Sequence, residues 1–280
     1  MSAPMRSSTL PPLSPNAWLR WAVVSRLLPP ADRDLTVLEV GCGQGGFGAR
    51  LAQRYRYVGV EPDALSCSVA QQRLALAGGH GEVRHGDLSV VAPQELFDLV
   101  CAFEVIEHIE DDAAALRSWC AHLAPGGTLL LSTPAWQKRF AAADEMVGHY
   151  RRYDPPVLRD LLTSAGLVDV ELVHFGAPLG YLLEAGRNAA GRRRLASGVA
   201  AESDPNGVAA EAGANGVAAG SRANPGAASH AARSHASGRT LQPSTSLTAA
   251  AARLGTLPFR AIQRAFPRTG PGLVALARRP

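Results

Sequence analysis

An acid and a glycine-rich turn at the end of an apolar run form the part of this chain that is best suited to bind a ligand. Glu39 lies within the run 37–40, and Gly41 and Gly43 follow at once. Glycine has no Cβ and tolerates positive φ, so the backbone can turn sharply and approach a ligand closely. A helix that begins near Phe47 would direct its free N–H groups at this turn. The pattern is typical of a nucleotide-like cofactor bound at the carboxyl edge of a parallel sheet.

Two further carboxylates follow at spacings that suit the same kind of cofactor. Glu61 ends a second apolar run 18 residues after Gly43, and Pro62 follows it. An acid at this distance can accept hydrogen bonds from both hydroxyls of a ribose. Asp87 and Leu88 come after a third, shorter run and bring another carboxylate to the same edge. The acids therefore favour a nucleoside-containing ligand.

Alternating apolar runs and helical stretches supply the elements that would position these acids. Such alternation predicts a doubly wound parallel sheet. We expect strands at 37–40, 57–61, just before 85, 97–104 and 123–131, then a helix over 156–165 and a strand over 168–175. A helix over 16–28, with Asn16 as its cap, precedes the first strand and could cover the cofactor.

Five motifs carry a resemblance to a known family. They are E-V-G-C-G-x-G at 39–45, G-V-E-P-D at 59–63, G-D-L at 86–88, F-D-L-V-x-x-x-E-V-I-E-H at 97–108 and L-x-P-G-G-T-L-L-L at 123–131. As a set they resemble class I S-adenosylmethionine-dependent methyltransferases of the small bacterial group related to ubiquinone and menaquinone methyltransferases. The resemblance covers residues 35–175.

This resemblance implies a fold and a cofactor. The fold is α/β: a doubly wound, mostly parallel, seven-stranded Rossmann-like sheet. Its last strand, expected at 272–279, is antiparallel and inserts between the fifth and sixth strands. The cofactor is S-adenosyl-L-methionine, with its methionine part near Glu39, its ribose on Glu61, its adenine amino group on Asp87 and its sulfonium near 104–108. The residues implied to bind it are Glu39, Gly41, Cys42, Gly43, Glu61, Pro62, Asp87, Leu88, Glu104 and Val105.

Two other functions stay open at this point. Gly41, Gly43 and Gly46 also fit the G-x-G-x-x-G spacing of an NAD(P)-dependent oxidoreductase. Against this reading, Glu39 would repel a pyrophosphate, whereas it would attract a sulfonium and an ammonium group. The second alternative is a scaffold that binds the cofactor without catalysis, although such a scaffold need not keep the three acids.

The segment after the fifth expected strand is rich in groups that could face an acceptor. Its G-H-Y-R-R-Y string at 148–153 resembles a recurring element of the same family. We expect His149 to act as the base where the acceptor loses a proton, because an imidazole can accept one near pH 7. The side chains expected to contact the acceptor are His108, Tyr150, Arg151, Arg152 and Tyr153. A structural loop tied by arginine–carboxylate and tyrosine hydrogen bonds is an equal alternative.

We expect neither a metal nor a disulfide. Glu104 and His108 could share one face of a helix, yet no third ligand is visible near them in the sequence. The four cysteines form no C-x-x-C pair, so we interpret them as small buried residues: Cys42, Cys67, Cys101 and Cys120.

Composition divides the chain into four parts. Residues 1–14 are expected to be a disordered leader, and 15–185 the methyltransferase domain, with a cofactor half at 35–131 and a substrate loop at 134–155. Residues 186–248 form an Ala/Gly/Arg-rich insertion without aromatic residues, which cannot bury enough apolar surface to offset its chain entropy. Residues 249–280 would complete the domain with a helix and the last strand.

Positive charge gathers in the last third of the chain. Residues 187–280 hold 13 arginines and 3 acids, whereas the first 186 residues hold 15 basic and 21 acidic residues. A basic helix at 254–266 could make weak peripheral contact with a membrane, and a solubilising role is the alternative.

The expected location of the protein and the expected class of acceptor rest on the absence of membrane-spanning, secretory and nucleic-acid-binding motifs. The sequence has no 18-residue apolar run and no secretory signal, so we expect a cytoplasmic protein. No nucleic-acid-binding motif is visible, so we expect a small-molecule or lipid acceptor, O-methylation, and no nucleic acid.

Overall fold

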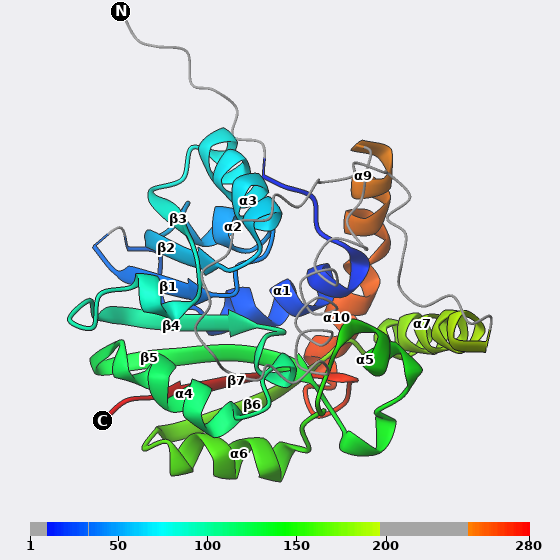
Figure 1. The fold of residues 1–280 in the computed structure, drawn as a ribbon. Helices are drawn as coiled ribbons and strands as arrows, with labels where there is room; N and C mark the ends of the chain where they lie inside the picture. Colours follow the sequence, from blue (N-terminus) through cyan, green and yellow to red (C-terminus); the bar gives the residue numbers. More distant parts are fainter. Residues whose placement is uncertain (1–9, 33, 197–245) are drawn as a thin grey trace, which may run out of the picture.

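Seven strands form a single sheet in the computed structural model, which describes residues 10–32, 34–196 and 246–280 (Figure 1). The strand order is β3-β2-β1-β4-β5-β7-β6, and β7 runs antiparallel to both of its neighbours while the other pairs are parallel. This confirms the predicted α/β fold and the inserted last strand. The strands are β1 (Thr36–Val40), β2 (Arg56–Glu61), β3 (Gly81–His85), β4 (Phe97–Phe103), β5 (Leu123–Pro134), β6 (Val168–Phe175) and β7 (Gly272–Arg278).

Helices cover both faces of the sheet. Successive residues of a strand point to opposite faces, so Val37 packs in one core cluster and Leu38 in the other. The helices α1, α2 and α3 cover the first face, and α4 and α6 cover the second. The helices are α1 (Pro15–Leu27), α2 (Gly48–Leu51), α3 (Ala64–Ala77), α4 (Asp112–Ala121), α5 (Ala142–Val147), α6 (Pro155–Ser164), α7 (Leu179–Ala196), α9 (Ser246–Gly255) and α10 (Leu257–Ala265).

The start of the domain differs from the expectation. The cap of α1 is Ser14, whose side chain accepts a hydrogen bond from the backbone N–H of Ala17, and Asn16 lies inside the helix. Leu13 is buried, and the carbonyl of Pro11 accepts a hydrogen bond from Arg50. Residues 10–14, which we assigned to a leader, therefore pack on the domain.

The predicted insertion also has different limits. Helix α7 continues through residue 196, and α9 begins at residue 246, so both ends of the segment 186–248 are helical. The remainder of that segment, with its two Asn-Gly-Val-Ala-Ala repeats, and residues 1–9 lie outside the described residues. Among the described residues, no helix combines the length and the apolar character that crossing a membrane requires.

Candidate functional site

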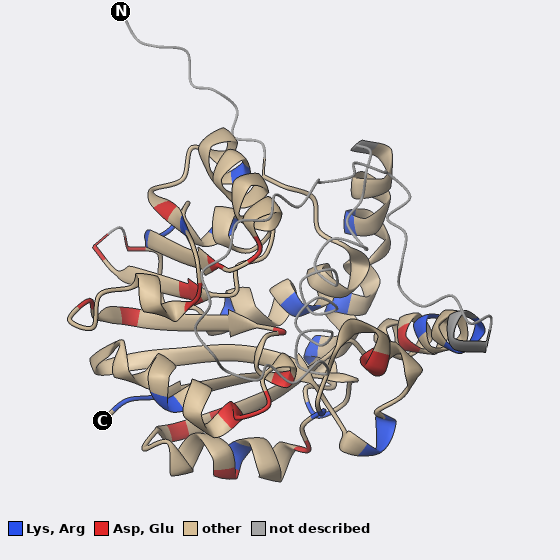
Figure 2. Ribbon diagram, in the orientation of Figure 1, with Lys and Arg blue, Asp and Glu red and all other residues tan. Residues whose placement is uncertain are grey.

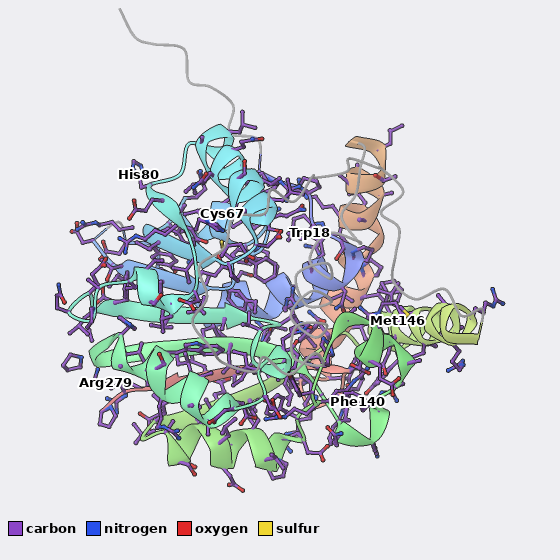
Figure 3. All side chains as sticks on the ribbon, viewed as in Figure 1. Trp18, Cys67, His80, Phe140, Met146 and Arg279 are labelled. Carbon is purple, nitrogen blue, oxygen red and sulfur yellow. The ribbon has the colours of Figure 1, made fainter. Side chains whose placement is uncertain are left out.

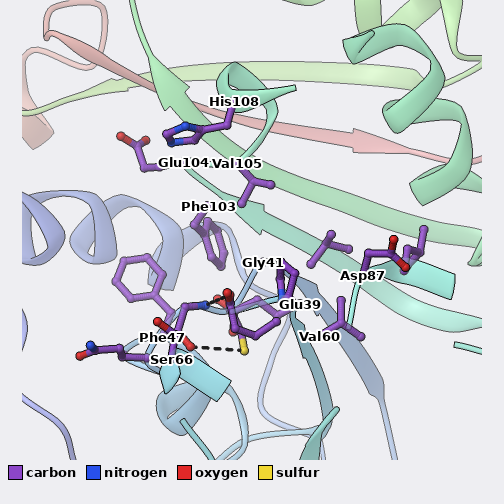
Figure 4. A pocket seen from close by; sticks show the side chains of 18 of the residues that line it. Glu39, Gly41, Phe47, Val60, Ser66, Asp87, Phe103, Glu104, Val105 and His108 are labelled. Atoms are coloured by element: carbon purple, nitrogen blue, oxygen red, sulfur yellow. Dashed lines mark hydrogen bonds between the residues drawn. The ribbon is translucent and has the colours of Figure 1, made fainter. Parts of the chain in front are cut away.

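A cavity of about 1120 Å³ opens at the carboxyl ends of β1, β2 and β4, where the strand order reverses (Figure 4). Open α/β sheets bind ligands at this kind of reversal. In Figure 4, Glu104 and His108 lie toward one end of the labelled side chains and Asp87 toward the other. The lining includes each residue predicted to bind the cofactor: Glu39, Gly41, Cys42, Gly43, Glu61, Pro62, Asp87, Leu88, Glu104 and Val105.

The glycine turn adopts backbone conformations that favour glycine. Gly41 and Gly43 have φ angles of +66° and +54°. A Cβ at Gly41 would lie 2.8 Å from Cγ2 of Val105, so a larger residue would clash as well as strain the turn. A Cβ at Gly43 would meet no protein atom within 4 Å, although Gly43 lines the cavity. The backbone at Gly43 is therefore open to close approach by a ligand.

Glu61 is held in place by backbone N–H groups. Its Oε2 accepts a hydrogen bond from the N–H of Gly43 at 2.7 Å, and its Oε1 accepts one from the N–H of Asp63 at 2.9 Å. The side chain is mostly buried yet lines the cavity. Since each carboxylate oxygen can accept more than one hydrogen bond, Glu61 keeps acceptor capacity for the hydroxyls of a ligand.

Glu39 is a buried acid at the base of the cavity. The hydroxyl of Tyr57 donates to its Oε2 at 2.7 Å. Burial, which outweighs this hydrogen bond, raises the pKa of Glu39 to about 8. The carboxyl is therefore largely neutral at pH 7, and a cation bound beside it would favour its ionised form.

Helix α1 contributes a residue that the sequence did not single out. Arg20 lines the cavity, and its Nη1 lies 3.0 Å from Oε1 of Glu104. Glu104 also accepts a hydrogen bond from Ser132. Glu104 and His108 do not share a helix, because Glu104 has a φ of +58° and only residues 106–108 form a short 3₁₀ helix, η2 (Ile106–His108).

His149 forms a dyad with Asp144, a residue of α5. The Nδ1 of His149 lies 2.8 Å from Oδ1 of Asp144, which Arg152 also contacts through two hydrogen bonds. Burial acts to raise the pKa of Asp144, but the hydrogen bonds from His149 and Arg152 dominate and lower it to about 2. An ionised Asp144 orients the imidazole, and His149 lines the cavity.

The other residues of the G-H-Y-R-R-Y string hold the loop and do not line the cavity. Arg152 is buried between Asp144 and Glu184 of α7. Arg151 pairs with Asp112, and Tyr153 donates to the same carboxylate at 2.7 Å.

Tyr150 donates its backbone N–H to the carbonyl of Glu107 and is likewise absent from the cavity lining. The structure thus favours the structural alternative for these four side chains and leaves His108 and His149 facing the cavity.

Glu107, His108 and His149 form a cluster that no sequence spacing revealed. Each offers one ligand atom, and these atoms lie within 4.8 Å of one another. Oε1 of Glu107 is fully buried and has no hydrogen-bond partner among the described residues. Burial, followed by the charge of Glu104, raises the pKa of Glu107 well above its ordinary value. We expected no metal because no third ligand was visible beside Glu104 and His108, and the fold groups His108 instead with Glu107 and His149.

A family model described as a methyltransferase domain matches residues 17–172, more than half of the chain. The chain belongs to this family. The matched residues of this methyltransferase run from α1 to β6, and they contain the glycine turn, the three acids and the His149–Asp144 dyad.

Curated relatives match parts of this methyltransferase. The ubiquinone biosynthesis O-methyltransferase of Methylobacterium sp. (strain 4-46) is 39% identical over 101 residues, which are 35% of this chain and 41% of that protein. A probable S-adenosylmethionine-dependent methyltransferase of Mycolicibacterium smegmatis is 32% identical over 165 residues, 56% of this chain and 62% of that protein. The trans-aconitate 2-methyltransferase of Azoarcus sp. (strain BH72) is 35% identical over 108 residues, 38% of this chain and 41% of that protein. The chain thus spans less than two thirds of the length of these relatives.

Solved structures share the fold of this methyltransferase. The [4+2]-cyclase SpnF has a TM-score of 0.54 at 18% identity, and the match covers 93% of this chain and 80% of that one. Phosphoethanolamine N-methyltransferase 2 of Haemonchus contortus, solved in complex with S-adenosyl-L-methionine, has a TM-score of 0.53 at 17% identity and covers 98% of this chain and 54% of that one. At such identities the likeness concerns the fold alone.

The cofactor of this methyltransferase is S-adenosyl-L-methionine. The cavity fits its chemistry, because the buried acid Glu39 suits a cationic group and the space beside Gly43 admits a ligand against the backbone. We expect the adenosine part near Glu61 and Asp87. Asp87 accepts hydrogen bonds from Ser89, which lower its pKa and keep it an ionised acceptor.

Proposed function

We propose that this methyltransferase moves the methyl group of S-adenosyl-L-methionine to a hydroxyl of a small-molecule or lipid-like acceptor. One observation carries the proposal: a single cavity is lined by the glycine turn and by the imidazole of His149. A hydroxyl must lose its proton when it is methylated, and an oriented imidazole can take it. The ubiquinone biosynthesis O-methyltransferases among the relatives favour oxygen as the receiving atom.

At the cofactor end, the side chains of this methyltransferase would bind and orient S-adenosyl-L-methionine. Glu61 would accept hydrogen bonds from the ribose hydroxyls, because its carboxylate is already fixed by two backbone N–H groups. Glu39 would face the ammonium and sulfonium charges, and Arg20 would face the carboxylate of the methionine part. The cofactor supplies a methyl group on a good leaving group, so alignment of the acceptor should provide most of the acceleration.

At the acceptor end, the hydrogen bond between His149 and Asp144 would orient the imidazole so that one ring nitrogen can accept a proton from the substrate. With Nδ1–H of His149 donating to the ionised Asp144, Nε2 is the nitrogen that can accept a proton, and it lies 3.9 Å from Oε1 of Glu107. Asp144 is then a positioning residue, and Arg152 holds it in turn. His108, whose ring lies edge-on to that of His149 with centroids 4.6 Å apart, would form a wall of the acceptor space.

The proposal is tested by mixing the protein with S-adenosyl-L-methionine and a panel of hydroxylated and non-hydroxylated acceptors, and by measuring released S-adenosylhomocysteine. We expect turnover only with hydroxylated acceptors. Calorimetry with NAD and NADP runs in parallel, and we expect no binding of either. Cofactor binding without turnover on any acceptor would favour a scaffold, and binding of NAD or NADP would favour an oxidoreductase.

His149→Ala tests the base directly. We expect kcat to fall by about 10²–10⁴-fold, the usual worth of general-base catalysis, with unchanged affinity for S-adenosyl-L-methionine. His80→Ala, an exposed histidine that does not line the cavity, is the matched control. A rate for His149→Ala within a few-fold of the unmodified protein would leave orientation as the whole mechanism.

Oε1 of Glu107 accepts no hydrogen bond among the described residues and lies 3.9 Å from Nε2 of His149, which favours a second role for the same cluster. Two imidazoles and a carboxylate suit a divalent cation such as Mn²⁺ or Zn²⁺. The base mechanism predicts that a chelator leaves turnover unchanged. Loss of turnover with the chelator and its recovery with added Mn²⁺ or Zn²⁺ would assign Glu107, His108 and His149 to a cation instead.

A further inference from the structure

Helices α9 and α10 expose a continuous apolar stripe. Its members recur at the spacing of one helix face and lie on the surface, with exposed fractions of 81% for Leu247, 62% for Leu254, 50% for Leu257 and 40% for Ile262. Soluble proteins rarely leave so long an apolar row facing water without a use. We call this row the C-terminal stripe: Leu247, Ala250, Ala251, Leu254, Leu257, Pro258, Ala261, Ile262 and Ala265.

Helix α10 is anchored to the domain by Phe259, which packs against the core, and by polar side chains, while the residues of the stripe stay exposed. Gln263 is buried, donates to the carbonyl of Leu19 in α1 at 2.8 Å and accepts from the N–H of Gly176 at 3.0 Å. Arg253 and Arg260 both lie over the ring of Trp18, which Figure 3 labels beside α9. These contacts occupy one side of α10, so Leu257, Ala261 and Ile262 remain exposed on its other side.

The charges that α9 and α10 carry have a single sign. Residues 246–280 contain six arginines and no acid, but Arg278 lies in β7, where it pairs with Asp169, and Arg279 donates to backbone carbonyls at that end of the sheet. Arg264 and Arg268 are exposed at the end of α10, next to the exposed ring of Phe266. In Figure 2, α9 and α10 carry basic positions and no acidic one. An exposed apolar row flanked by basic side chains is the combination that binds the surface of an anionic bilayer.

We propose that the C-terminal stripe docks this methyltransferase on an anionic lipid bilayer. The apolar side chains would enter the interface between headgroups and acyl chains, while Arg264 and Arg268 meet lipid phosphates. A second copy of the chain fits less well, because a two-fold contact through this face would bring arginine against arginine with no acid in the segment to compensate.

The helices that carry the stripe contact a helix that lines the cavity. Helix α1 lines the cavity through Asn16, Ala17 and Arg20, and it contacts α9 and α10 (Figure 1). A bilayer bound at the stripe would thus be separated from the cavity lining by α9, α10 and α1. Docking at the stripe does not depend on which acceptor is methylated.

Vesicle sedimentation with the full chain tests the proposal. We expect binding to vesicles of phosphatidylcholine mixed with phosphatidylglycerol, at least ~tenfold weaker binding to phosphatidylcholine alone, and weakening with added salt, because both apolar burial and charge contribute. The variant Leu254→Gln/Leu257→Gln/Ile262→Gln should bind the anionic vesicles at least ~tenfold more weakly. Its affinity for S-adenosyl-L-methionine should be unchanged, since none of the three residues lines the cavity.

A matched control alters three equally exposed apolar residues elsewhere: Leu65→Gln/Leu76→Gln/Val157→Gln. We expect this variant to bind vesicles like the unmodified protein. Equal losses in the two triple variants, or no binding of the unmodified protein to anionic vesicles, would overturn the proposal. Light scattering adds a further check: a dimer that the stripe variant abolishes would assign the stripe to self-association. If the stripe variant fails to fold, the comparison of the two vesicle compositions still decides.

Discussion

The two ends of the cavity are held in place by different kinds of contact. At the cofactor end, the N–H of Gly43 meets Glu61 at 2.7 Å across two paired strands. At the acceptor end, Arg152 joins Asp144 of α5 to Glu184 of α7 at 2.7 and 3.0 Å. The first contact follows from parallel pairing and a tight turn. The second exists only after elements far apart in the sequence have met.

This difference predicts that the two ends can be damaged separately. A backbone-held site should survive the loss of a distant ion pair, because the sheet fixes its geometry. A site held by a buried charge should be sensitive to that charge, because an unpaired partner left in a poorly solvated place is costly. Variants that unpair the buried charges of the acceptor end should therefore affect folding and turnover, and variants of the backbone-held Glu61 should affect binding.

The largest effect is expected from Arg152→Ala. The change leaves the buried carboxylates of Asp144 and Glu184 without their shared cation. We expect a loss of about 3–5 kcal/mol in the free energy of unfolding, measured by urea denaturation, because breaking a buried ion pair from one side has that cost. The folded fraction should still bind S-adenosyl-L-methionine normally in calorimetry.

Arg151→Ala is the matched control for this change. Arg151 pairs with Asp112, but its side chain is 29% exposed, so water can replace the lost partner. We expect a loss of at most about 1 kcal/mol in the free energy of unfolding. Equal losses for the two variants would mean that the buried pair at Arg152 does not hold the acceptor end.

The next effect is a pH dependence that Glu39 should give to the protein without cofactor. The pKa of Glu39 is about 8 when folded, against 4.5 for the free side chain. The folded state therefore holds a proton that the unfolded state releases, and the contribution of Glu39 to stability is complete below pH 4.5 and falls as the pH rises to about 8. We expect a slope of up to about 1.4 kcal/mol per pH unit in this range.

Glu39→Gln should remove this slope while keeping an acceptor for Tyr57. The free energies of unfolding of the two proteins, measured by urea denaturation at several pH values, should diverge between pH 4.5 and 8. Affinity for the cationic cofactor should rise with pH in the unmodified protein but not in the variant. Parallel curves would show that Glu39 does not titrate in this range.

The smallest effect is expected at the cofactor end itself. Glu61→Ala removes an acceptor that we expect to take charge-assisted hydrogen bonds from the ribose. Affinity for S-adenosyl-L-methionine should fall by roughly 1.5–3 kcal/mol in calorimetry, the range for hydrogen bonds to charged groups. Glu61→Gln, which keeps the size but not the charge, should lose less. Unchanged affinity in both variants would remove Glu61 from the cofactor site.

The sequence predicted the cofactor end well because its signals are local. The turn at Gly41 and Gly43 and the acid at Glu61 are each read from a strand and the residues next to it. Parallel pairing then brings them to one edge, as a regular sheet must. The roles of these residues in binding stay predictions, whereas their common position in the cavity is a finding.

The contacts at the acceptor end were not predicted, because the side chains that pair there come from elements that are far apart in the sequence. Arg152 and Tyr153 were assigned to the acceptor on their type, yet their side chains turn to carboxylates from other elements. Arg20 of α1 lines the cavity, and Glu104 has a positive φ directly after β4; neither was predicted from the sequence. Only Asp144 carried a local signal, since it stands five residues before His149.

The sequence by itself determined the order of strands and helices, the glycine turn and the acids that follow the strands. These features follow from the periodicity of apolar side chains, the conformational freedom of glycine and the connection rules of parallel sheets, which depend mainly on local sequence. The tertiary structure alone decided which charges are paired, which imidazole faces the cavity, and that α9 and α10 turn their apolar face outward. Those outcomes depend on burial and on partners tens of residues away, and burial is a property of the assembled fold rather than of any segment.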